Sequence, residues 1–179
     1  RKGADYLVKA YRKIKRDIPN SRLIIVGPGT VLRSKYERAV EKDGLSDVVF
    51  AGFSSYQDLP RYYQTADVFC APATGWESFG IILLEAMAAG LPAVVTRNGG
   101  PSESLYDHDN GQEYGVLVDP ADPADVARRE RMVGLAARHS WAAVYPCNRQ
   151  PRRPSLKRLP KRRPHQQPAS RTRALKCAI

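Results

Sequence analysis

The chain is poor in cysteine, and its cysteines are not spaced as metal ligands. Of 179 residues only Cys70, Cys147 and Cys177 are cysteines. Their spacing matches no zinc motif, and nothing in it requires disulfides. Cys70 lies within an apolar run, which is typical of a reduced thiol in a core. The composition therefore argues against a disulfide-rich secreted domain and predicts no metal site.

Long hydrophobic runs are also missing. No apolar run approaches the roughly 18 residues of a membrane span. The first residues, Arg1-Lys2-Gly3, do not form a signal peptide. We therefore expect a protein of the cytoplasm.

Acidic residues are absent from the last part of the chain. Residues 146–179 contain eleven of the 29 Lys and Arg but none of the 18 Asp and Glu, so residues 1–145 hold 29 − 11 = 18 basic and 18 acidic residues. Six of the 14 prolines also fall in this last part. The composition predicts a neutral domain over 1–145 and a disordered basic tail over 146–179. Two interpretations of the tail stay open: an arm for nucleic acid or an acidic surface, and a product of out-of-frame translation or a chimeric gene.

Short apolar runs alternate with amphipathic segments throughout the first domain. Runs rich in Val, Ile and Ala predict strands, and the segments between them predict helices of about ten residues. This alternation predicts a parallel sheet with crossover helices on both faces. The predicted strands are 23–26, 48–51, 68–71, 93–96 and 116–118, and the predicted helices are 5–17, 33–43, 56–65 and 79–89.

The stretch from Gly75 to Gly90 contains the candidate site. It reads as a loop with Glu77, an N-cap at Ser78, a helix and a terminating glycine, Gly90. The N–H groups at the start of a helix form an anion site. We therefore expect the backbone of Ser78, Phe79, Gly80 and Ile81 to face an anion.

Glu85 is the unusual residue of the predicted helix. It lies in the run Ile-Ile-Leu-Leu-Glu-Ala-Met, which is apolar on nearly every face. Burying a carboxylate is costly unless a partner satisfies it. Glu77 and Glu85 lie eight residues apart, about 12 Å along a helix, which suits the two ends of an elongated ligand. The plain alternative is that Glu85 is partly exposed and that Glu77 is a solvated acid of the loop.

The spacing of these residues resembles a known family. A glutamate followed by Ser-Phe-Gly, with a second glutamate after seven intervening residues within Glu-Ala-Met-Ala-x-Gly, is similar to the donor-site motif of retaining glycosyltransferases with the GT-B fold. The resemblance covers residues 1 to about 127. Residues 1–90 are most similar to phosphatidylinositol mannosyltransferases, and the segments 98–103 and 115–120 are closer to sucrose-phosphate synthases.

The resemblance implies a role for each candidate residue. Glu77 would hold sugar hydroxyls, and Lys2 would contact the diphosphate as the second catalytic residue. Glu85 would accept from the ribose hydroxyls. The base would lie beside the remaining candidates, Gly52, Phe53, Ala71 and Pro72. The substrate would be a nucleotide-sugar, with no metal or other cofactor.

The resemblance also implies that the chain is incomplete. GT-B enzymes have two such domains, and this chain resembles the second, donor-binding one from just after its first strand. The acceptor-binding half would be missing, so we expect no transfer by the chain alone. A lipid acceptor would place the enzyme at the membrane surface.

Three other functions remain open at this level. A stand-alone module that binds a nucleotide-sugar would need the same glutamates and glycine loops. An epimerase of the same fold is less consistent with Glu-Ser-Phe-Gly followed by Glu85. A nucleic-acid-binding role would depend on the basic tail alone, and the neutral first domain argues against it.

Overall fold

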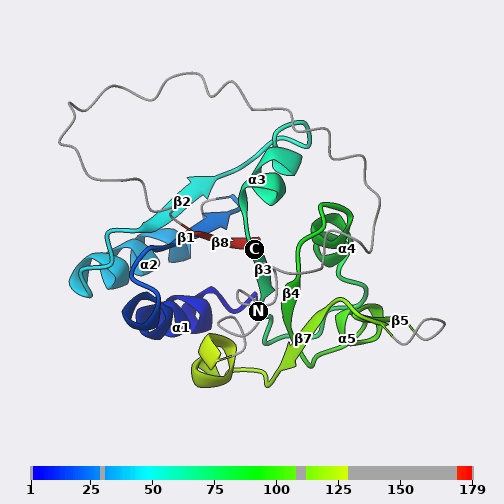
Figure 1. The fold of residues 1–179 in the computed structure, drawn as a ribbon. Coiled ribbons are helices and arrows are strands. Elements are labelled where there is room, and N and C mark those ends of the chain that lie inside the picture. The colour runs from blue at the N-terminus through cyan, green and yellow to red at the C-terminus, as the bar shows by residue number, and fades with distance from the viewer. Residues whose placement is uncertain (1, 29–30, 108–111, 129–172, 179) are drawn as a thin grey trace.

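The computed structural model describes residues 2–28, 31–107, 112–128 and 173–178. Helices and strands alternate along the chain, as the sequence predicts (Figure 1). In chain order the elements are α1 (Ala4–Asp17), β1 (Ser21–Val26), α2 (Val31–Lys42), β2 (Val48–Gly52), α3 (Leu59–Thr65), β3 (Val68–Ala71), α4 (Ile81–Ala88), β4 (Ala93–Thr96), α5 (Pro101–Ser104), β5 (Tyr106–Asp107), β6 (Gln112–Glu113), β7 (Gly115–Val118) and β8 (Arg173–Ala178).

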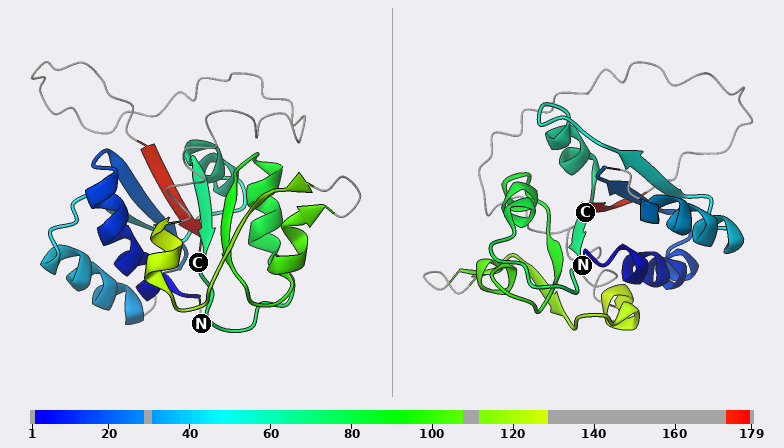
Figure 2. Two further views of the ribbon diagram at one scale, coloured as in Figure 1. Left: turned by 60° about the horizontal axis from the view of Figure 1, so that its bottom comes forward. Right: turned by 180° about the vertical axis from the view of Figure 1, so that it is seen from behind.

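One parallel sheet organises the domain. Its strand order is β2-β1-β8-β3-β4-β7, and every pairing within it is parallel. The strands β5 and β6 form a separate antiparallel pair. Helices cover both faces of the large sheet (Figure 2). The predicted class, a Rossmann-like sheet between helices, is therefore confirmed.

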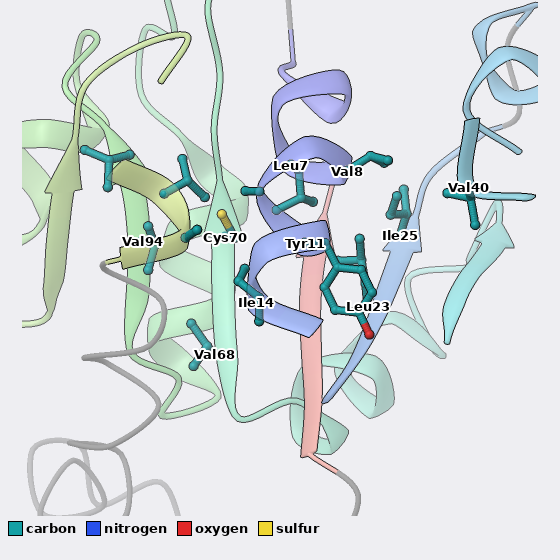
Figure 3. Close-up of a cluster of buried hydrophobic side chains, with 14 residues drawn as sticks. Leu7, Val8, Tyr11, Ile14, Leu23, Ile25, Val40, Val68, Cys70 and Val94 are labelled. Carbon is teal, nitrogen blue, oxygen red and sulfur yellow. The ribbon is translucent and has the colours of Figure 1, made fainter. Parts of the chain in front are cut away.

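The apolar strand runs arise because both faces of the sheet are buried. Along β3, Val68 and Cys70 belong to one buried cluster, whereas Phe69 belongs to the other. The side chains of successive strand residues point to opposite faces, so a strand covered on both sides needs apolar residues at every position. In Figure 3, Leu7, Tyr11 and Ile14 of α1 lie over one face of the sheet. The cluster on the opposite face contains the buried side chains of α3 and α4, and the cluster beneath α1 contains none of them.

The strand β8 corrects the prediction for the end of the chain. Residues 173–178, which the sequence places in a disordered tail, lie in the middle of the sheet between β1 and β3. The segment Arg-Ala-Leu-Lys-Cys-Ala has neither alternation nor a wholly apolar run, so local pattern does not predict a strand there. Pairing on both sides makes it one. Residues 146–172, and the domain boundary predicted at 145, lie outside the described residues.

Among the described residues, no helix combines the length and the apolar character needed to cross a membrane.

Asp47 links α1 to the start of β1. Its Oδ2 accepts a hydrogen bond of 2.6 Å from Nζ of Lys15, and Arg22 Nη2 lies 3.9 Å from its Oδ1. The backbone carbonyl of Asp47 also accepts from the N–H of Leu23. The hydrogen bond from Lys15 is the main reason that the pKa of Asp47 lies below its ordinary value of 3.8.

This lowered pKa predicts a pH-dependent contribution to stability. A carboxyl group with a lowered pKa stabilises the fold above its unfolded pKa and loses that effect as the pH falls through the folded pKa. We expect Asp47→Asn to lower the free energy of unfolding by about 0.2–1 kcal/mol at pH 7, the scale of a partly exposed ion pair. The difference should shrink below pH 3.8. Urea unfolding at pH 7 and pH 3 measures both values. An equal loss at both pH values would contradict an electrostatic origin.

Candidate functional site

The candidate site lies at the carboxyl edge of the parallel sheet. In open α/β sheets this edge is where ligands bind. Gly52, Ala71 and Thr96 are the last residues of β2, β3 and β4, so their following loops meet there. The loop after β3 carries Glu77 and leads into α4.

The loop after β4 is hydrogen-bonded to the loop after β3, which carries Glu77. Glu77 and Gly99 form an isolated parallel bridge, and the N–H of Gly100 donates to the carbonyl of Glu77 at 3.1 Å. The Asn98 side chain donates to the carbonyl of Gly75 at 2.7 Å, and the Thr96 hydroxyl donates to the carbonyl of Ala73 at 2.6 Å. The bridge and the two side-chain hydrogen bonds therefore fix the backbone around Glu77.

Only glycine fits this contact between the two loops. A Cβ at Gly99 would lie 2.2 Å from the Glu77 carbonyl oxygen, and one at Gly100 would lie 2.1 Å from the Ser78 carbonyl oxygen. Gly99 also has a φ of 82°, which favours glycine. Larger residues would push the loops apart and shift Glu77.

The helix that follows begins later than predicted. The prediction that Ser78 caps the helix is wrong, because α4 begins at Ile81 and its N-cap is Gly80 with a φ of 75°. The bridge to Gly99 holds residue 77 in an extended conformation, and Gly80 turns the chain against Pro101. Tertiary contacts thus override the helix propensity of the first two residues. Gly90 does have the predicted left-handed conformation, with a φ of 72°.

Lys2 and Glu77 form an ion pair at the edge. The Lys2 Nζ lies 2.7 Å from Glu77 Oε2, and the two side chains are 50% and 28% exposed. Gly3 positions Lys2, because its backbone lies so close to Pro72 that a Cβ would come within 1.7 Å of the Pro72 carbonyl oxygen. Two residues 75 positions apart are therefore brought together by the packing of the chain start against the end of β3.

A small hollow opens beside this pair. Its lining is mostly apolar side chains, with the ion pair and the start of α4 on one side. The residues that line it are Lys2, Ala71, Ala73, Glu77, Gly80, Ile82, Leu83, Val95, Thr96, Asn98 and Pro101. Four predicted site residues (Lys2, Ala71, Glu77 and Gly80) thus meet at one place.

Glu85 lies on α4 beyond the hollow and is half-buried. Its Oε2 accepts a hydrogen bond of 2.9 Å from the hydroxyl of Tyr63, a buried residue of α3. The Tyr63 ring packs against Phe69 with ring centroids 5.9 Å apart. A fixed phenol thus holds one carboxylate oxygen in an otherwise apolar helix.

The remaining predicted residues do not line the hollow. Ser78, Phe79 and Ile81 are exposed around the start of α4, and Phe79 and Ile81 are 59% and 64% exposed. Phe53 follows β2 and is 78% exposed, whereas Gly52 ends that strand in the left-handed region.

Pro72 is buried directly after β3, against Gly3. Pro72 therefore acts through its backbone contact with Gly3, which positions the neighbouring Lys2.

Sequence reasoning missed the residues that hold the two glutamates in place. In the sequence, Tyr63 is one residue of a short predicted helix and Thr96 is the last residue of a predicted strand, and neither position indicates a contact with the site. The Asn98-Gly99-Gly100-Pro101 segment, directly after a strand, did carry a signal, because two adjacent glycines there indicate a close backbone approach.

Within the described part of the chain, no group of three or more His, Cys, Asp or Glu side chains is arranged to hold a metal ion. The charged residues that line the hollow are Lys2 and Glu77.

These features define a class of protein: one half of a GT-B glycosyltransferase. The fold is similar to sucrose-phosphate synthase from Thermosynechococcus elongatus, with a TM-score of 0.66, 29% identity, and coverage of 79% of this chain and 35% of that one. It also matches the fold of Anabaena Alr3699/HepE, solved with UDP and glucose, with a TM-score of 0.60, 24% identity, and coverage of 79% and 40%.

The chain belongs to the glycosyl transferases group 1 family, whose sequence model matches residues 1–132. A GDP-mannose-dependent alpha-(1-6)-phosphatidylinositol monomannoside mannosyltransferase of Mycolicibacterium smegmatis is 35% identical over 158 residues. A phosphatidyl-myo-inositol mannosyltransferase of Mycobacterium tuberculosis is 39% identical over 140 residues. The matches cover 79% and 76% of this chain but only 40% and 34% of those proteins. The chain therefore spans well under half the length of these relatives.

Proposed function

We propose that this chain is the donor-binding half of a retaining hexosyltransferase and that it binds a nucleoside diphosphate sugar. The observation that carries the proposal is the meeting of Lys2, Glu77 and the start of α4 at one hollow. A cation and a helix N-terminus favour a diphosphate, and a carboxylate accepts from sugar hydroxyls.

The proposed chemistry is the departure of a nucleoside diphosphate from the sugar. Negative charge develops on the leaving phosphate, and donors fixed in advance stabilise it. Lys2 supplies a full positive charge, and the first N–H groups of α4, which have no partner within the helix, supply partial ones. No metal ion is needed in this scheme, because these groups face the same anion.

The two glutamates are proposed to hold opposite ends of the donor. Glu77, at the hollow, accepts from the sugar hydroxyls. Glu85, farther along α4, accepts from the ribose hydroxyls with the oxygen that Tyr63 leaves available. The base lies along the sheet edge, near the backbone of Gly52-Phe53 and Ala71-Pro72. Names of relatives support a nucleotide-sugar, since one is GDP-mannose-dependent and a structural neighbour was solved with UDP-glucose.

The acceptor is proposed to bind to a second half, since the relatives are more than twice as long as the matched region. Several of these relatives act on phosphatidylinositol derivatives by name, which is consistent with a lipid acceptor at a membrane surface. A stand-alone binding module without transfer is the alternative.

The experiment that tests the proposal is calorimetric titration of the chain with UDP, GDP, UDP-glucose and GDP-mannose. We expect at least one diphosphate and its sugar to bind. Glu77→Gln should weaken binding of the nucleotide-sugar by roughly 5- to 150-fold, the cost of a hydrogen bond to a charged group, and leave the free diphosphate unchanged. Glu41→Gln, an exposed change on α2, is the control.

Three outcomes would count against this assignment. No binding of any of the four ligands would overturn the donor-binding role. If Glu77→Gln reduced the affinity for the diphosphate and for the nucleotide-sugar equally, Glu77 would not be contacting the sugar. Robust formation of glycoside by the chain alone, with common acceptors, would show that no second half is needed.

A further inference from the structure

The strand β2 forms an open edge of the large sheet. In the part of the sheet that the structure describes, β2 pairs with β1 alone (Figure 1). The carbonyl of Phe50 accepts a hydrogen bond of 3.4 Å from Nη2 of Arg33, a side chain of α2, and not from a strand. The sequence of β2, Val-Val-Phe-Ala-Gly, contains neither a charged residue nor a proline, two features that protect edge strands from pairing with another chain. The edge is therefore able to accept a further strand.

An apolar groove of about 490 Å³ runs along the same edge. It is lined by α2, by β2 and by the loop between them, through Arg33, Glu37, Val40, Glu41, Leu45, Val48, Val49 and Phe50. Val48 and Phe50 pack against the cluster that contains Val40 of α2. Successive strand residues point to opposite faces, so Val49 lies on the other face, where it is 42% exposed. The edge thus offers apolar surface on both faces of the strand.

Exposed large apolar side chains are concentrated near this edge. Of the eight that the described residues expose, four lie on α2, on β2 or just after β2, namely Leu32, Val49, Phe53 and Tyr56. Phe53 and Tyr56 are 78% and 88% exposed. Clustered apolar surface marks sites of interaction, and aromatic residues are enriched in protein interfaces. These side chains therefore favour a protein as the partner of the edge.

The charges on α2 show which protein the edge suits. Arg33, Glu37 and Glu41 are spaced four residues apart, so they form one stripe along the groove. The stripe is basic at its start and acidic toward its end. Because α2 connects two parallel strands, it starts at the carboxyl edge of the sheet and ends at the opposite edge. A second copy related by a two-fold axis perpendicular to the sheet reverses this order. The basic end of each stripe then faces the acidic end of the other, which is the self-complementarity that a two-fold interface requires.

We propose that β2 is a dimer interface and that its partner is β2 of a second copy of this chain. The two strands run antiparallel and join the sheets of both copies into one continuous sheet through backbone hydrogen bonds. Both α2 helices lie on the same face, with their charged stripes side by side.

The arrangement leaves the candidate site open. The two-fold axis places the carboxyl edges of the two sheets at opposite ends of the interface. The hollow beside Glu77 is formed by β3, β4 and α4, which lie away from β2 in the strand order. The inference therefore stands whether or not the chain binds a nucleotide-sugar.

The first test is analytical ultracentrifugation of the full chain over a wide range of concentration. We expect the unchanged chain to show a concentration-dependent equilibrium between monomer and dimer. Val49→Lys puts a charge into the paired edge of each copy and should raise the dissociation constant of the dimer by about tenfold or more. Val49→Thr is the matched control, because it is β-branched and uncharged, and it should dimerise as the unchanged chain does. Thermal unfolding followed by circular dichroism confirms that both variants fold.

A reversal of charge tests the two-fold arrangement separately. Arg33→Glu removes the basic end of the stripe and should raise the dissociation constant by roughly tenfold. A triple variant with Arg33→Glu, Glu37→Arg and Glu41→Arg reverses the whole stripe. It keeps opposite charges across the axis and an ion pair between positions 33 and 37, which lie 2.7 Å apart from Nε to Oε1 in the structure. Its dissociation constant should return close to that of the unchanged chain.

Three results would overturn the proposal. The unchanged chain could stay monomeric at every concentration. A dimer could form that Val49→Lys leaves intact, which would place the interface on another surface. The triple variant could dissociate as readily as Arg33→Glu, which would show that the stripes do not face each other in an antiparallel, two-fold dimer.

Discussion

Replacing Leu175 by proline is expected to destabilise the domain severely. Leu175 lies in the middle of β8 and pairs with Leu23 on one side and Val68 on the other. Proline has no backbone N–H and is excluded from central strands. Because β8 joins the two halves of the sheet, the damage is not confined to an edge. We expect the midpoint of thermal unfolding to fall by 10 °C or more, or the cooperative transition to disappear, in a scan followed by circular dichroism.

Leu175→Ile is the matched control, because a β-branched residue is compatible with a strand and keeps the N–H. Its unfolding midpoint should lie close to that of the unchanged chain. A tail that is dispensable throughout, as its composition suggests, would give the same melt for proline, isoleucine and leucine. That result would show that β8 contributes nothing to the stability of the sheet.

Replacing Glu85 by glutamine is expected to weaken nucleoside diphosphate and nucleotide-sugar alike by roughly 5- to 150-fold. This range corresponds to the 1–3 kcal/mol usually lost with a hydrogen bond to a charged group. Both ligands contain ribose, so both should lose affinity, which distinguishes Glu85 from Glu77. The two ribose hydroxyls are the proposed partners. The unchanged chain should therefore bind a 2′-deoxynucleoside diphosphate less tightly, and Glu85→Gln should remove most of that difference.

Tyr63→Phe tests how Glu85 is held. The hydroxyl of Tyr63 donates to Glu85 Oε2 at 2.9 Å, so the variant keeps the carboxylate but frees it to rotate. We expect a smaller loss of affinity than in Glu85→Gln, together with a smaller preference for ribose over deoxyribose. Glu41→Gln should bind as the unchanged chain does. Full affinity in Glu85→Gln, measured by calorimetry on a folded variant, would contradict the ribose role.

Much of the fold could be predicted from the sequence because its strands are buried on both faces. Runs such as residues 23–26, 68–71 and 93–96 are apolar at every position, and all three form strands within one residue or two of the predicted bounds. The amphipathic stripe of α1 and the left-handed Gly90 are likewise local properties. Each depends on side-chain chemistry over a few neighbouring residues, which the sequence displays directly.

The candidate site could be predicted only in part, because its key contacts join distant residues. The sequence indicated Glu85 by its place in an apolar helix, and Glu77 by its spacing from Glu85 and by the family motif. It did not indicate that Gly99 lies on the backbone of Glu77, or that Tyr63 holds Glu85 from another helix. The wrong cap at Ser78 has the same origin, since helix propensity favours a start that the contact with the loop after β4 prevents.

By itself the sequence determined the alternating α/β class and the chemistry of the residues at the carboxyl edge. The tertiary structure alone decided which segment completes the sheet. Residues 173–178 have the composition of a basic tail, and only the open hydrogen-bonding edges of β1 and β3 make them a strand. Backbone groups at such edges must be paired when buried, whatever the distance along the chain to the segment that pairs them.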